Sequence, residues 1–166
     1  MKKILVVILM VVGSSFSSQA QVNEHALGVR LASSNFFWAP EVSYQFGLSQ
    51  RNRLEFDAGA VLATGNWMRT RLSGIFHWDW NIFNSLNWYI GPGAQVGFYQ
   101  DFDNANNSGL TVAVGGQIGL EYDFKKQFDV PVLVSLDVRP MFDFLRPDPN
   151  VLLWLPAGAL SARYVF

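Results

Sequence analysis

Polar and apolar residues alternate along most of this chain, and the alternation is clearest between residues 110 and 124. Every second residue there is apolar or glycine, beginning with Leu110, Val112 and Val114, and the residues between them are small or polar. A period of two is typical of a β-strand with one apolar face. Residues 88–99 alternate in the same way, and the link between the two segments is rich in Asn, Asp and Gly. The two segments therefore predict a β-hairpin.

Segments of this kind recur along the whole chain, separated by turn-forming residues. They cover residues 25–32, 37–48, 53–63, 68–80, 88–99, 110–124, 130–142 and 151–166. Pro140 lies in the seventh segment, and we expect it to end regular pairing because proline cannot donate to a sheet. Ile75 interrupts the polar set of the fourth segment. The pattern predicts an all-β fold, an eight-stranded antiparallel up-and-down β-barrel.

The polar face of these segments collects charges of both signs, whereas the other face is nearly free of charge. The charged residues are Arg30, Glu41, Glu55, Asp57, Arg69, Arg71, Asp79, Glu121, Asp137, Arg139 and Arg163. In a soluble, lipocalin-like barrel the apolar face would fill the interior. In a transmembrane barrel the apolar face meets lipid and the charges lie in the lumen. Alternation alone is compatible with both.

Three features favour the transmembrane barrel. The segments are long, since a membrane-spanning strand needs about 9–11 residues and a strand of a soluble protein usually has ~5–6. Aromatic residues gather at the segment ends, as in the girdles of membrane barrels, although strands favour aromatic residues in any case. One rim would hold Trp78, Trp80, Trp88, Tyr122, Phe124, Tyr164 and Phe166, and the other Trp38, Trp67 and Trp154. The polar face also carries small residues that leave room in a narrow lumen. They are Gly91, Gly93, Gly97, Gly115 and Gly119.

The first twenty residues indicate export. Lys2 and Lys3 precede an apolar run over residues 4–12, and the stretch ends in Ser18-Gln19-Ala20. This pattern predicts a secretory signal peptide, residues 1–20, that is cleaved after Ala20 and leaves residues 21–166 as the barrel domain. The chain has no cysteine and a formal net charge of −1. We therefore expect no disulfide framework, no nucleic-acid partner and no cofactor.

The chain ends in Tyr164-Val165-Phe166, which resembles the C-terminal signal of bacterial outer-membrane barrels. Ser161 stands where that pattern often has glycine. Together with the signal peptide and the strand number, this ending resembles small eight-stranded outer-membrane barrel proteins of the OmpX and OmpA-barrel class. The resemblance implies location in the outer membrane of a Gram-negative bacterium, with outer-membrane lipid and the barrel-assembly machinery as partners. It also assigns Tyr164 and Phe166 as the assembly signal.

Two short motifs carry a further resemblance. Gly91-Pro92-Gly93 and Asp137-Val138-Arg139-Pro140 resemble recurring features of uncharacterised Bacteroidetes barrels.

If the polar face lies inside, its charges must be paired, because an isolated buried charge is costly. We predict an ion-pair network in the lumen that consists of Arg30, Glu55, Asp57, Arg69, Arg71, Asp79, Glu121, Asp137, Arg139 and Arg163. Such a network could fill the barrel or gate a narrow pore. An eight-stranded interior is just wide enough for side chains, which favours filling.

Catalysis is the main alternative, because some barrels of this class act on lipid A. Ser73, His77 and Asp79 share one face, but Ser73 and His77 would lie ~13 Å apart along a strand, too far for a hydrogen bond. We expect His77 to contact Asp79 or an arginine, and His25 to be solvated at a rim. Asp101 and Asp103 begin a polar link without the closing Glu of a calcium loop.

The sequence thus favours a monomeric structural or surface-interaction barrel that is not an enzyme. A lipid A-modifying enzyme, a narrow pore and a soluble lipocalin-like binding barrel are the alternatives.

Overall fold

The computed structural model describes residues 22–34, 37–62, 67–103, 108–145 and 154–166. The predicted signal peptide and the start of the predicted eighth segment lie outside these residues. The strands are β1 (His25–Ser34), β2 (Phe37–Gly47), β3 (Asn52–Leu62), β4 (Trp67–Phe83), β5 (Leu86–Asp101), β6 (Gly109–Asp123), β7 (Val132–Leu145) and β8 (Trp154–Val165). A short helix, α2 (Phe124–Phe128), links β6 and β7.

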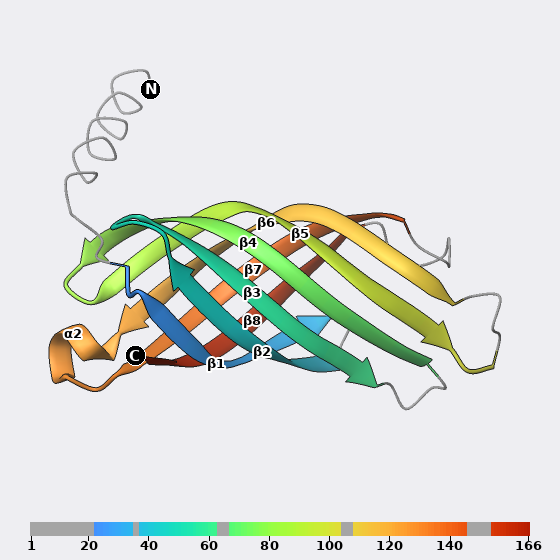
Figure 1. The fold of residues 1–166 in the computed structure, drawn as a ribbon, viewed down its shortest axis with the longest axis horizontal. Helices are drawn as coiled ribbons and strands as arrows, with labels where there is room; N and C mark the ends of the chain where they lie inside the picture. Colours follow the sequence, from blue (N-terminus) through green and yellow to red (C-terminus); the bar gives the residue numbers. More distant parts are fainter. Residues whose placement is uncertain (1–21, 35–36, 63–66, 104–107, 146–153) are drawn as a thin grey trace, which may run out of the picture.

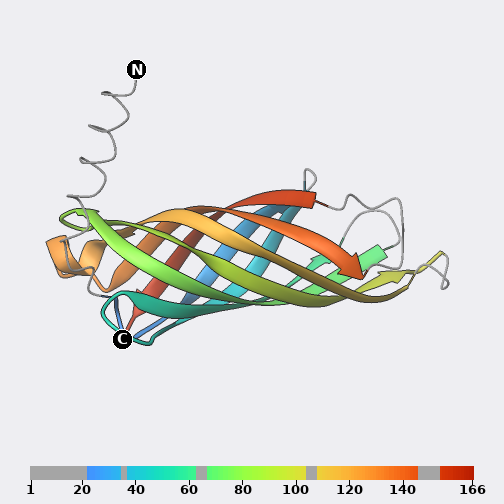
Figure 2. The same ribbon diagram turned by 90° about the horizontal axis from the view of Figure 1, so that it is seen from above.

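The strands close into one antiparallel barrel in sequence order (Figures 1 and 2). Each strand pairs with the next, and β8 returns to pair with β1 from Ala26↔Val165 to Ala32↔Ala159. Each of the described strands therefore has a paired neighbour on both sides, without an open sheet edge. The predicted all-β, eight-stranded up-and-down barrel is confirmed.

Both ends of the described chain lie at one end of the barrel, beside α2 and the short turns (Figure 1). We call this end the terminal end. The other end, where β4 begins at Trp67 and β5 ends at Asp101, is the hairpin end. Among the described residues, no helix is long and apolar enough to cross a membrane.

Several strand boundaries differ from the prediction, and two of the differences have a local chemical cause. Phe124 belongs to α2 rather than to the sixth strand, because the side chain of Asp123 caps the helix by accepting a hydrogen bond from Lys125 N (3.0 Å). Pro140 does not end pairing: β7 continues to Leu145, and Pro140 lies opposite Pro156 of β8. Proline removes one donor from a ladder, and the flanking residues keep the strand in place.

The two faces of the wall separate by polarity. Inward-facing residues such as Arg30, Glu55 and Arg163 are nearly inaccessible, whereas outward-facing residues such as Val29 and Leu136 are about 57% and 62% exposed. The interior is therefore polar and the exterior apolar. This orientation is opposite to that of a soluble barrel with an apolar interior.

Among the described residues, three small apolar clusters also lie on the inner wall. Ala26, Leu133 and Val165 pack at the terminal end. Ile75, Ala113 and Met141 form a second cluster, so Ile75 interrupts the polar face because it belongs to this cluster. Ala32, Ala39 and Ala159 form a third cluster.

Trp67 does not belong to an outer aromatic girdle as predicted, since it packs inside the wall against this third cluster. The other two tryptophans predicted for the hairpin-end rim, Trp38 and Trp154, have side chains outside the described part of the structure.

Candidate functional site

Charged side chains form many ion pairs in the lumen of the barrel, and we take this network as the candidate site. The structure places all the residues of the predicted network on the inner wall, and each forms at least one ion pair. They are Arg30, Glu55, Asp57, Arg69, Arg71, Asp79, Glu121, Asp137, Arg139 and Arg163. The period-two backbone explains this placement, because every charged residue of a strand shares its parity with the buried ones.

Glu55 of β3 is the centre of the network and is fully buried. Its carboxylate accepts from Arg139 and Arg163, each at 2.9 Å. Gln45 and Gln117 donate to the same carboxylate at 2.8 and 3.2 Å. A carboxylate with four donors from different strands is well compensated for the loss of water.

The arginines around Glu55 are themselves held by further partners. Arg139 also pairs with Asp57 at 2.5 Å and donates to the hydroxyl of Ser73 at 2.9 Å. Arg163 donates to the hydroxyls of Ser43 and Ser135 at 2.9 and 2.8 Å.

A second group of pairs lies toward the hairpin end. Arg30 binds Glu41 and Asp137, both at 2.6 Å. Arg71 binds the other oxygen of Glu41 at 2.8 Å, and Arg69 binds Asp143 at 3.1 Å.

A third group lies toward the terminal end, around Arg53 of β3. Its guanidinium pairs with Glu121 at 2.6 Å and with Asp79 at 3.3 Å, and it lies over the ring of Tyr89, 4.8 Å from the centroid. His77 Nδ1 lies 3.4 Å from Arg53 Nε, and the His77 ring packs on Tyr89. The expected contact of His77 with an arginine is thus present.

Two of the residues considered for catalysis, Ser73 and Asp79, are partners of arginines in these groups of ion pairs. Ser73 accepts from Arg139, and Asp79 pairs with Arg53. At the terminal end His25 is half-buried rather than solvated as expected, because it stacks on Phe166 and its ring nitrogen lies 2.9 Å from the Tyr44 hydroxyl. Among the described residues, no group of His, Cys, Asp and Glu is arranged to hold a metal ion.

Sequence reasoning missed three charged members of the network. Glu41 and Asp143 were assigned to the polar face but not to the network, and Arg53 was taken only as the first residue of a strand. Parity was the available signal for Arg53, since it has the same parity as Glu55 and Asp57 of β3.

Glycines make room for these side chains. A Cβ added at Gly119 would lie 2.5 Å from the Tyr89 ring, and one at Gly59 would lie 2.6 Å from Glu41 Cγ. Real Cβ atoms do not approach other heavy atoms so closely, so a larger residue at these inward positions would force its neighbours to shift. The packing of the lumen therefore requires glycine there.

Replacing Gly119 with alanine should therefore destabilise the barrel by about 1–3 kcal/mol through overpacking. Urea unfolding of the purified protein in phospholipid vesicles would measure the loss. Gly74→Ala is the matched control, because a Cβ at outward-facing Gly74 would lie 3.6 Å from the nearest atom of Phe56, an ordinary contact. Equal unfolding midpoints for the two variants would contradict a tightly packed lumen.

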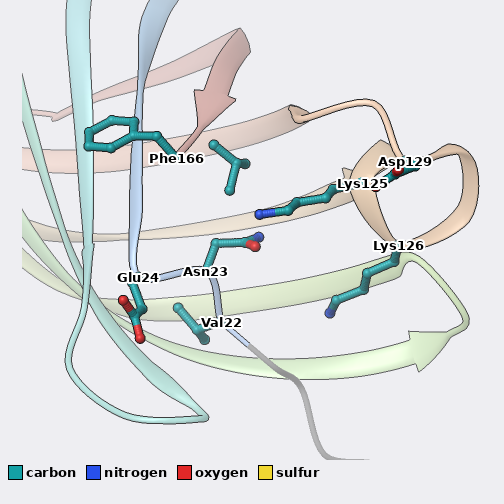
Figure 3. Close-up of a pocket in the computed structure, with 8 residues that line it drawn as sticks. Val22, Asn23, Glu24, Lys125, Lys126, Asp129 and Phe166 are labelled. Carbon is teal, nitrogen blue, oxygen red and sulfur yellow. The ribbon is translucent and has the colours of Figure 1, made fainter.

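The terminal end also carries a cavity of about 440 Å³ (Figure 3). Lys125 and Lys126 of the helix segment line it on one side, and Asn23 and Glu24 on the other. Asn23 donates to the buried carboxylate of Asp123 at 3.1 Å, which fixes the chain across this end of the barrel. Charges of both signs line the cavity, so its electrostatics select neither anions nor cations.

A closed eight-stranded barrel with ion pairs inside and apolar side chains outside is the architecture of small outer-membrane β-barrels. No family model and no curated protein match the sequence. The fold is similar to that of Neisserial surface protein A, with a TM-score of 0.57, 14% identity, and coverage of 86% of this chain and 94% of that chain. The N-terminal β-barrel domain of Pseudomonas aeruginosa OprF gives a TM-score of 0.57 and 18% identity over 89% of this chain and 100% of that chain.

A third similar structure is Ail, the attachment invasion locus protein of Yersinia pestis, with a TM-score of 0.50 and 9% identity over 86% of this chain and 96% of that chain. The predicted resemblance to small outer-membrane barrels is therefore confirmed for the fold.

Proposed function

We propose that this chain is a monomeric integral β-barrel protein of the outer membrane of a Gram-negative bacterium, with a structural or surface-interaction role and a closed lumen. The observation that carries the proposal is the ion-pair network centred on Glu55 inside an apolar outer wall. Charged side chains on the outer wall would be costly in a lipid bilayer, because the bilayer core contains no water to solvate them. An apolar outer wall around a charged, ion-paired interior is therefore the arrangement that a membrane barrel needs.

The packing of the lumen supports a structural role over that of a pore. Glu55 and Arg163 are almost completely inaccessible, and Ala26, Leu133 and Val165 form a buried apolar cluster on the inner wall at the terminal end. The use of Ser73 and Asp79 as partners of arginines likewise supports a role without catalysis.

A surface-interaction role is the kind of role that the names of two similar structures describe for those proteins, one a surface protein and the other an attachment protein. For this chain the role is part of the proposal. The terminal end would face the periplasm and the hairpin end the outside.

Two measurements on the full chain test the proposal. We expect the protein to remain in the membrane fraction until detergent is added, and release by buffer alone would contradict the membrane placement. In planar lipid bilayers we expect no large, steady single-channel conductance, and such a conductance would contradict the closed lumen.

The assembly signal gives a separate prediction. Phe166 is 61% exposed at the terminal end, and we propose that the barrel-assembly machinery reads it together with Tyr164. Phe166→Lys should reduce the amount of folded barrel in outer membranes, measured by heat-dependent mobility on gels. Phe102→Lys is the control, since Phe102 is 59% exposed but lies toward the hairpin end. Equal yields of the two variants would remove the role of Phe166.

A further inference from the structure

The outer wall contains an apolar hollow of about 400 Å³ across four neighbouring strands. Trp78 of β4, Ile90 and Pro92 of β5, Gly116 and Ile118 of β6, and Pro140 of β7 line it. Its volume falls within the range of about 300–1,000 Å³ that ligand pockets occupy. Gly91 and Gln117 also line the hollow, at inward-facing positions, and the side chain of Gln117 binds Glu55 in the lumen. The residues named before them face outward, so the hollow lies on the outer side of the wall.

The sequence creates the hollow by removing side-chain volume at adjacent positions. Pro92 pairs with Gly116 across β5 and β6. The registered pairs of β4 and β5 stop at Ile75↔Gly93 and resume at Trp78↔Ile90, so Pro92 lies in an interruption of that ladder. Proline has no N–H to donate, which explains why the interruption falls there.

A similar interruption lies on the other side of β6. The registered pairs of β6 and β7 run from Gly115↔Met141 to Ile118↔Val138 without the two positions between them, where Gly116 and Pro140 lie. A Cβ at Gly116 would lie 2.8 Å from the carbonyl oxygen of Gly91, so the approach of the two strands requires glycine. The floor of the hollow is thus backbone, and two proline rings fix its shape.

We propose that this hollow binds one acyl chain of a phospholipid from the periplasmic leaflet. The inference rests on the proposed membrane placement. Because no water is available within the bilayer core, only an apolar occupant can fill the hollow. The side chains that line an empty hollow would lack partners for dispersion contacts. An acyl chain in the hollow makes more of these contacts than an acyl chain on a flat part of the wall, and is therefore bound more tightly.

The height of the hollow identifies the leaflet. Pro92 lies four residues beyond Trp88 on β5, counted from the terminal end. At about 3.3 Å per residue and a strand tilt of about 40°, this is roughly 10 Å along the barrel axis. Half of a hydrocarbon core of about 30 Å is about 15 Å. If Trp88 lies at the membrane interface, the hollow therefore lies within the leaflet on the terminal side.

Trp80 and Trp88 mark the level of the headgroups on the same strands. Their rings stack with centroids 4.5 Å apart, between the hollow and the terminal end. Tryptophan favours the membrane interface, so a lipid with its headgroup beside this pair would extend its chain toward Ile90 and Pro92.

Native mass spectrometry of the full protein, purified from outer membranes in mild detergent, tests the inference. We expect one bound phospholipid per barrel. After delipidation, addition of 1-palmitoyl-2-oleoyl-phosphatidylethanolamine should restore this one-to-one complex. Ile118→Trp and Ile90→Trp each place a large ring in the hollow, and each should weaken phospholipid binding by about tenfold, equivalent to about 1.4 kcal/mol. Val114→Trp is the control, because Val114 lies on the same face of β6, outside the hollow, and is similarly exposed (43% against 47% for Ile118).

Several results would overturn the inference. They are no bound phospholipid, equal binding by all variants, lipid A in place of phospholipid, or a lipid-free dimer that the ring substitutions separate. Heat-dependent gel mobility shows whether each variant is folded. Release from membranes without detergent would instead contradict the membrane placement itself, so the two failures can be told apart.

Discussion

Replacing Glu55 with glutamine should lower the free energy of unfolding by about 3–5 kcal/mol, because it leaves buried positive charge without its partner. Arg139 keeps its pair with Asp57, but Glu55 is the carboxylate that the structure pairs with Arg163. Reversible urea unfolding in phospholipid vesicles measures the change. Glu24→Gln is the matched control, because Glu24 is exposed at the terminal end, and we expect a change within about 0.5 kcal/mol.

A double variant separates the ion pair from a general packing defect. Arg163→Met in the Glu55→Gln background removes the charge that would be left alone, so much of the lost stability should return. If Glu55→Gln is no less stable than Glu24→Gln, or if the second substitution adds its full cost, the network does not hold the barrel together as described.

The second large effect concerns the outer wall. Val138 lies in the middle of β7 and is 45% exposed on the apolar face. Val138→Arg should destabilise the barrel in vesicles by about 2–4 kcal/mol, because the charge would lie in the middle of the hydrocarbon core. The same unfolding measurement applies.

Val130→Arg is the control for this substitution. Val130 is 46% exposed in the link that follows α2, outside the strands, and a charge at the interface costs about 0–1 kcal/mol. If the wall faced water, both arginines would be tolerated alike, and that result would contradict the membrane placement.

The strands and their faces could be predicted because period two is a local property of the chain. Leu110, Val112 and Val114 reveal an apolar face without knowledge of any neighbour. The ends of the strands were harder to predict where a side chain favours another local structure. At Asp123 the side chain caps a helix that begins inside the predicted strand. Trp67 was assigned to the outer rim because the predicted fourth segment begins at residue 68, whereas β4 begins at Trp67 and gives it the inward parity of Arg69.

The partners within the lumen could not be predicted, because they depend on which strands face each other across the closed barrel. Arg30 meets Asp137 across a separation of 107 residues, and Arg163 meets Glu55 across 108. The hollow in the outer wall has the same origin. Pro92, Gly116 and Pro140 belong to three separate strands, and nothing local to each strand shows that the register places them side by side in one hollow.

The orientation of the wall can be measured directly, since the chain has no cysteine of its own. Single cysteines at Val134, Leu136 and Val138 of β7 can carry nitroxide spin labels on the barrel in vesicles. We expect these labels to collide with oxygen dissolved in the bilayer and to be shielded from a water-soluble nickel chelate. Labels at these positions that collide with the nickel chelate and not with oxygen would contradict an apolar wall in lipid around a charged lumen.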